Sequence, residues 1–130
     1  MPHLTVNAFE SDLQGREADL IASLTDAVAG IYGEWARAQV VVLLNGFPAG
    51  RWGVGGTVAE SAAPIVELGI REEAFARPDA AELAPAIIAA VTEAIVSVLG
   101  EQARDGLLVE LIGTPAARTG LGGVPATQAG

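Results

Sequence analysis

The stretch Pro48-Ala49-Gly50-Arg51-Trp52-Gly53-Val54-Gly55-Gly56 returns later in this chain as Pro115-Ala116-Ala117-Arg118-Thr119-Gly120-Leu121-Gly122-Gly123. A proline, an alanine, an arginine and three glycines match in register. The agreement extends upstream at the same offset, because Thr25-Asp26-Ala27-Val28 aligns with Thr92-Glu93-Ala94-Ile95. Self-similarity at a fixed offset is the signature of a repeated structural unit. The sequence therefore predicts two copies of one unit, fused head to tail.

The first copy alternates between strand and helix patterns. Residues 4–9 form a short apolar-rich run that predicts a strand. Apolar side chains recur at helical spacing over 20–31, and Gly33 stands where a helix commonly ends. Residues 40–44 are continuously apolar, which is typical of a strand buried on both faces. Strand, helix and second strand predict a βαβ unit with a right-handed crossover.

The second copy repeats this plan, with strands predicted at 65–70 and 107–112 and an apolar helical stripe from 83 to 98. Its helix start is less regular. Asp79 with Glu82 three residues later resembles a capping box. Proline is favoured in a first helical turn, so we expect the regular helix to begin at Pro85.

Two such units side by side predict an α+β fold, with a four-stranded sheet and both helices on one face. The length suits a single domain over residues 1–130, made of units at about 2–56 and 64–123 with a short linker between them. We expect the tail after residue 123 to be loosely ordered. An apolar sheet face left bare would be an aggregation hazard, so the pattern also predicts self-association.

Composition excludes several classes of function. The chain has no cysteine and no lysine, and His3 is its single histidine, which argues against thiolate nucleophiles, lysine Schiff bases and multi-histidine metal sites. A formal charge of −9 without a basic run argues against nucleic acid. Neither a signal peptide nor an apolar run long enough for a bilayer is evident, so we expect no membrane association and a cytoplasmic location.

Pro2 has the most unusual chemistry in the chain. A small residue at position two permits removal of the initiator methionine, which would leave the proline nitrogen as a secondary amine. A free α-amino group has a pKa of about 7.7–8.0, and burial lowers it. Such a base suits proton transfer at carbon next to a carbonyl. On position alone, however, Pro2 is better interpreted as an ordinary second residue.

Pro2 opening a strand, an amphipathic helix, an apolar second strand and then Arg51-Trp52-Gly53-Val54-Gly55-Gly56 resembles the tautomerase superfamily. The chain is most similar to the 4-oxalocrotonate tautomerase group, whose short subunits are single βαβ units. Here two units appear fused from Pro2 to Gly123. The fused members of the family form trimers, so the resemblance implies a homotrimer.

The resemblance also implies roles for particular residues. Pro2 would be the general base and acid, and Trp52 falls on the family's active-site aromatic. Pro64 falls on the catalytic proline of the second unit, but as an internal residue its nitrogen is an amide without basicity. Thr119 replaces the aromatic in the second copy, so we expect that second site to be inactive.

Arginines that would bind a substrate carboxylate match the family less well. The positions used by single-unit tautomerases hold Asp12 and Val41. Dehalogenases and hydratases of the superfamily place an arginine at the end of the second unit's first strand, where Arg71 stands, while Ala74 replaces their next arginine. Further candidates for substrate binding are Arg77, Arg37 and Arg104. Residues interpreted as structural are Arg51, Arg118, Tyr32 and Trp35.

The leading hypothesis is a cofactor-free tautomerase that acts on a small enol or 2-hydroxydienoate carboxylate. A hydratase, dehalogenase or decarboxylase of the same superfamily is an alternative, with protonated Pro2 as the acid. A second alternative is a trimeric binding module in which Pro2 is inert. A third has Pro2 form an iminium with an aldehyde.

Overall fold

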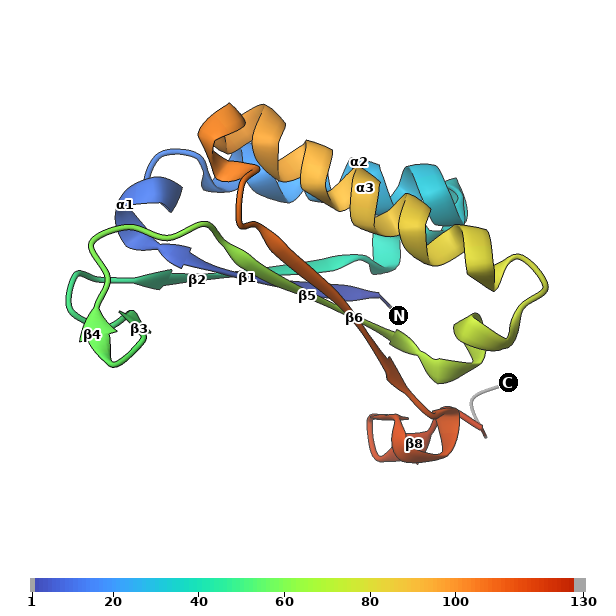
Figure 1. The fold of residues 1–130 in the computed structure, drawn as a ribbon. Coiled ribbons are helices and arrows are strands. Elements are labelled where there is room, and N and C mark those ends of the chain that lie inside the picture. The colour runs from blue at the N-terminus through green and yellow to red at the C-terminus, as the bar shows by residue number, and fades with distance from the viewer. Residues whose placement is uncertain (1, 128–130) are drawn as a thin grey trace.

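Figure 1 shows a computed structural model that describes residues 2–127. It contains one four-stranded sheet in the order β2-β1-β5-β6, with two long helices across one face. This arrangement confirms the predicted α+β class and the two βαβ units. The first unit consists of β1 (His3–Phe9), a short α1 (Glu10–Leu13), α2 (Glu17–Tyr32) and β2 (Val41–Phe47); the second consists of β5 (Ile65–Arg71), α3 (Ala80–Leu99) and β6 (Leu108–Thr114).

Each unit ends in a small hairpin. The first pairs β3 (Gly53–Val54) with β4 (Thr57–Val58), and the second pairs β7 (Gly120–Leu121) with β8 (Val124–Pro125). The two hairpins lie at opposite ends of the sheet (Figure 1). Short 3-10 segments cover Glu34–Gln39, Glu72–Ala76, Glu101–Ala103 and Ala116–Arg118.

Strand direction sets which residues meet at each end of the sheet. Within each unit the two strands are parallel, whereas β1 and β5 pair antiparallel, with His3 opposite Gly69 and Asn7 opposite Ile65. The start of β1 therefore lies beside the end of β5. This pairing brings Pro2, which precedes β1, next to Arg71, which ends β5.

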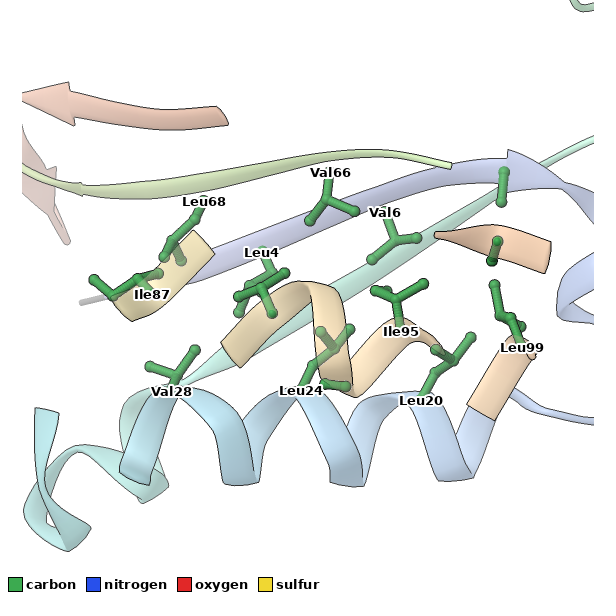
Figure 2. Close-up of a cluster of buried hydrophobic side chains, with 14 of the residues drawn as sticks. Leu4, Val6, Leu20, Leu24, Val28, Val66, Leu68, Ile87, Ile95 and Leu99 are labelled. Atoms are coloured by element: carbon green, nitrogen blue, oxygen red, sulfur yellow. The ribbon is translucent and has the colours of Figure 1, made fainter. Parts of the chain in front are cut away.

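The core lies between the sheet and the helices (Figure 2). Leu4 and Val6 of β1 and Val66 and Leu68 of β5 are fully buried, because alternate side chains of a strand share one face. They meet apolar residues spaced three or four apart on each helix. The helix residues labelled in Figure 2 are Leu20, Leu24, Val28, Ile87, Ile95 and Leu99.

The opposite face of the sheet is bare and partly apolar in this single chain. Val41 and Leu43 on β2 and Leu108 and Ile112 on β6 are 42–50% exposed. The same strands turn their other side chains toward the helices, which produces the alternating burial seen along both. The predicted uncovered face is therefore present.

The start of α3 differs from the sequence-based prediction. The helix begins at Ala80, so Pro85 lies inside it and the expectation of a start at Pro85 was wrong. Pro85 is the sixth residue of the helix and lies past the first N–H groups that have no partner, so it removes one backbone hydrogen bond from the helix. The capping box is absent as well: the Asp79 side chain makes no cap bond, and its carboxylate accepts a hydrogen bond from Arg77 Nη2 at 3.0 Å.

The regions after the glycine-rich stretches are more ordered than expected. Thr57 and Val58, assigned to the linker, belong to the first hairpin, and Val124 and Pro125 belong to the second. Ala59 N donates to Trp52 O at 2.8 Å in one hairpin, and Ala126 N donates to Thr119 O at 2.6 Å in the other. The remainder of the tail, 128–130, lies outside the described residues.

By length and composition alone, α3 could cross a membrane, since its mean hydropathy reaches 1.8. This differs from the expectation that the chain has no apolar run long enough for a bilayer. Its apolar stripe nevertheless packs against the sheet, with Ile87, Val91 and Ile95 at most 1% exposed. That packing is typical of a core helix in a globular domain.

Candidate active site

Pro2 lies in a cavity of about 290 Å³ at the start of β1. The antiparallel pairing of β1 with β5 supplies Arg71 from the second unit, and the C-terminal end of α2 supplies Tyr32. Because α2 runs back across the strands, its end lies over the start of β1. The complete lining is Pro2, Tyr32, Trp35, Ala36, Gln39, Ile70, Arg71 and Ala74.

Local backbone geometry fixes the wall of this cavity. Gly33 ends α2 with a φ of 114°, a region that side chains other than glycine rarely adopt. The turn places the Trp35 ring against Gly33, and Trp35 Nε1 donates to Tyr32 O at 3.0 Å. Pro2 O in turn accepts from Val41 N at 3.2 Å, which holds Pro2 beside β2. The proline is therefore held by the sheet itself.

Tyr32 is the residue that sequence reasoning undervalued. Its hydroxyl is buried and has no hydrogen-bond partner among the described residues. Burial raises the pKa of Tyr32, and nearby Arg77 opposes that shift without reversing it. The side chain therefore stays a neutral donor at ordinary pH. The sequence did contain one indication of this position. Tyr32 ends α2, and in a βαβ unit the C-terminal end of the helix lies over the start of the first strand.

A second cavity of about 450 Å³ adjoins the first. The two cavities share Ile70 and Arg71, so the Arg71 side chain lies between them. Within residues 2–127, Arg71 forms no salt bridge. It is thus a cation available to a ligand. The second lining is His3, Gly69, Ile70, Arg71, Thr114, Arg118, Thr119, Gly120, Leu121 and Ala126.

Trp52 lies at the other end of the sheet. Its ring centroid is 5.4 Å from that of Phe9 at the end of β1 and 5.5 Å from that of Phe47 at the end of β2. Pro2 is at the start of β1, so one chain does not bring Trp52 and Pro2 together. Trp52 can reach a Pro2 cavity only if a neighbouring protomer carries it there.

The remaining arginine candidates bind carboxylates of their own chain. Arg37 pairs with Asp26 at 2.6 Å, and Arg104 pairs with Glu93 at 2.6 Å. Each also pairs with a glutamate three residues before it, and hydrogen bonds from these two arginines hold the pKa values of the Glu34, Glu93 and Glu101 carboxyls below their usual range. Arg77 pairs with Asp79 at 3.0 Å. None of the three arginines lines the Pro2 cavity.

Pro64 marks the corresponding end of the second unit. It is fully buried and lines a cavity of about 300 Å³ together with Asp12 and Arg16. Arg16 Nη1 donates to Leu99 O at 3.3 Å. The shape of a pocket persists here, but the nitrogen of Pro64 is part of a peptide bond. Its lone pair is delocalised into the carbonyl group, so this nitrogen is not basic. Among the described residues, no group of three or more His, Cys, Asp or Glu could hold a metal ion.

Comparisons with known proteins agree with this fold. The family described as Tautomerase enzyme matches residues 2–62. The solved structure of the F6 fused 4-OT wild-type asymmetric trimer has a chain that is 30% identical to this one. The match covers 98% of this chain and 98% of that chain, with a TM-score of 0.82. No curated protein sequence matches the chain.

Two further solved structures share the fold at lower identity. Pt0534 inactivated by 2-oxo-3-pentynoate is 24% identical over 98% of each chain, with a TM-score of 0.81. N1, a member of the cis-3-chloroacrylic acid dehalogenase family, is 21% identical over 95% of this chain and 82% of its own, with a TM-score of 0.74. With the family match and the 30% identical fused 4-OT, the conclusion is that the chain belongs to the tautomerase superfamily, as a two-unit protein of the fused 4-OT type.

Proposed function

We propose that this protein is a cofactor-independent tautomerase in which Pro2, exposed by removal of Met1, transfers a proton within an enol or 2-hydroxydienoate carboxylate. The observation that carries the proposal is that Pro2 and Arg71 line one cavity. A base and a cation in one partly apolar pocket are what a small acidic enol requires.

The reaction is a proton shift with no net change in oxidation state. The neutral Pro2 amine accepts the hydroxyl proton of the dienol, and the O–H electron pair forms the carbonyl. The double bonds shift along the conjugated chain, and the protonated Pro2 returns the proton at C3 or C5. Arg71 pairs with the substrate carboxylate and stabilises the negative charge that develops on the dienolate.

Assembly belongs to the same proposal. The exposed apolar side chains of β2 and β6 would be covered by further copies of this chain, in a homotrimer like the F6 fused 4-OT asymmetric trimer. The cytoplasmic location expected from composition stays a prediction.

Hydration and dehalogenation are the main enzymatic alternatives, since Arg71 occupies the position that the resemblance assigns to those enzymes and N1 shares the fold. Both reactions need a carboxylate that activates water. Among residues 2–127 of one chain, no aspartate or glutamate lines the Pro2 cavity or the adjoining cavity. The residues that line the two cavities therefore favour tautomerisation over hydration and dehalogenation. Decarboxylation is a further alternative for the same site.

The test is alkylation of Pro2 by 2-oxo-3-pentynoate, the reagent that inactivated Pt0534. We expect the intact mass of the purified protein to lack Met1, and a single adduct to map to Pro2, absent from Pro2→Ala and from Pro64. Enol ketonisation, followed by absorbance, should be lost in parallel with labelling. Retained methionine would refute the proposal. A free but unreactive Pro2 would favour the non-catalytic binding module, and trapping of an aldehyde adduct by hydride would favour iminium chemistry.

A further inference from the structure

The two units differ at one matched cluster of three side chains. In the first unit Phe9 and Phe47 are opposite each other at the ends of β1 and β2, and the Trp52 ring packs against both. The matching positions of the second unit are the ends of β5 and β6 and the residue before β7. They hold Arg71, Thr114 and Thr119, respectively.

All three replacements line the cavity of about 450 Å³. Where the first unit has three aromatic rings in contact, the second has two small side chains and one long cationic side chain. The volume is within the ordinary range for small-molecule sites. The loss of the aromatic cluster thus accounts for the cavity, and it occurs at the Pro2 end of the sheet.

The chemistry of the lining indicates what would fill the cavity. Thr119 Oγ1 donates to Pro115 O at 2.9 Å, so its hydroxyl is already engaged. Ile70, Leu121 and Ala126 add apolar surface, and the Arg71 guanidinium is shared with the Pro2 cavity. An acid anchored at Arg71 can therefore extend away from Pro2 into a cavity that is largely apolar, although His3 and Arg118 also line it.

We propose that this cavity is the binding site for a bulky apolar substituent, an aryl or branched alkyl group, of the carboxylic acid that Arg71 holds beside Pro2. The proposal rests on the proposed function for the identity of the reacting acid. It adds that Thr119 and Thr114 determine substrate size: small side chains at these positions admit substituents that the aromatic residues of the first unit would exclude.

The experiment measures binding of unreactive acids to the assembled protein by calorimetry. Propionate and 3-phenylpropionate share the carboxylate and differ by a phenyl ring. Burial of the ring should make 3-phenylpropionate bind about tenfold or more tightly than propionate. Thr119→Trp and Thr114→Phe each restore the residue of the first unit, and each should abolish this preference while propionate binding persists. Thr119→Ser should retain the preference, and Arg71→Ala should weaken both acids.

Two results would overturn the inference: equal affinity of the wild type for both acids, or an unchanged preference in folded Thr119→Trp and Thr114→Phe. Binding needs no free amine at Pro2, so the two proposals fail separately. An unreactive Pro2 together with a phenyl preference would remove the tautomerase and keep the cavity. A reactive Pro2 without the preference would do the reverse.

Discussion

The two ends of the sheet are built to one plan and carry different chemistry. At one end Pro2 shares a cavity with Arg71, and a second cavity opens beside it. At the other end Pro64 is buried within the chain, and Trp52 fills the space beside Phe9. In the proposed function Pro2 is the base, and Pro64 cannot take that role because its nitrogen lies within a peptide bond.

The features that fold each unit have stayed the same. Arg37 bonds Asp26 and Glu34 in the first copy, and Arg104 bonds Glu93 and Glu101 in the second, with each pair of carboxylates at matching positions. Gly33 and Gly100 end their helices with similar φ values of 114° and 106°. The two units therefore share their stabilising contacts and differ in the residues that line their cavities.

The largest expected effect separates the two prolines. Pro2→Ala should lower kcat/KM for enol ketonisation by about 10²–10⁴-fold, because it removes the secondary amine that moves the proton. Pro64→Ala changes a nitrogen without basicity and should leave kcat/KM within about threefold of wild type. Steady-state absorbance assays on both variants measure the contrast. Equal losses would contradict the assignment of the active end.

A second prediction contrasts the two faces of the molecule. Leu43→Arg places a charge on the bare sheet face and should convert the proposed trimer to monomers, because burial of an unpaired charge is costly. Ile21→Arg is the matched control, since Ile21 on α2 is exposed to 43% and Leu43 to 50%. Sedimentation velocity reports both masses. A Leu43→Arg trimer would show that another surface makes the assembly.

The arginines at the two ends should also differ. Arg71→Ala should lower kcat/KM by about ten- to a hundredfold, as expected for loss of a charge-assisted hydrogen bond to the substrate carboxylate. Arg16→Ala lies at the Pro64 end and should leave kcat/KM unchanged. The effect of Arg71→Ala should be smaller for an enol substrate without a carboxylate, because only the stabilisation of the dienolate charge is then lost. An undiminished loss there would contradict the pairing of Arg71 with the substrate carboxylate.

A substitution of Tyr32 tests whether its hydroxyl in the Pro2 cavity lacks a hydrogen-bond partner. If its buried hydroxyl stays without a partner in the assembled protein, Tyr32→Phe should raise the free energy of unfolding by about 1 kcal/mol. Urea titration monitored by circular dichroism measures this. A fall in stability would show that a neighbouring protomer supplies the partner, and a fall in kcat/KM alone would assign the hydroxyl to the substrate.

The smallest expected effect concerns the arginine–carboxylate pairs that both units contain. The folded pKa values of Glu34, Glu93 and Glu101 lie below their ordinary range, so their contacts with arginine add stability above about pH 4.3 and lose it as pH falls through the folded values. Arg37→Ala with Arg104→Ala should therefore make Tm less dependent on pH between about pH 5 and pH 3. These pairs are exposed, so the change should be small. Parallel curves for wild type and double variant would contradict it.

The sequence predicted the long helices and strands, and it failed at a few particular residues. Periodicity located every long strand and both long helices, because each unit buries one apolar face and repeats it. It misplaced the start of α3 at Pro85, since local preference for proline in a first turn was overridden by packing of Leu83 in the core. It also took Tyr32 and Trp35 as packing residues, because a one-dimensional pattern does not show which end of a helix covers which end of a strand.

The sequence by itself determined the duplication, the α+β class and the bare apolar sheet face. These follow from the local spacing of apolar residues and from the internal repeat. Only the tertiary structure decided that Arg71 and Pro2 line one cavity, that Trp52 lies at the opposite end, and that Arg71, Thr114 and Thr119 line a second cavity. The first depends on the antiparallel pairing of β1 with β5, a contact between residues some sixty positions apart that no local pattern specifies. The other two depend on the parallel pairing of the strands within each unit.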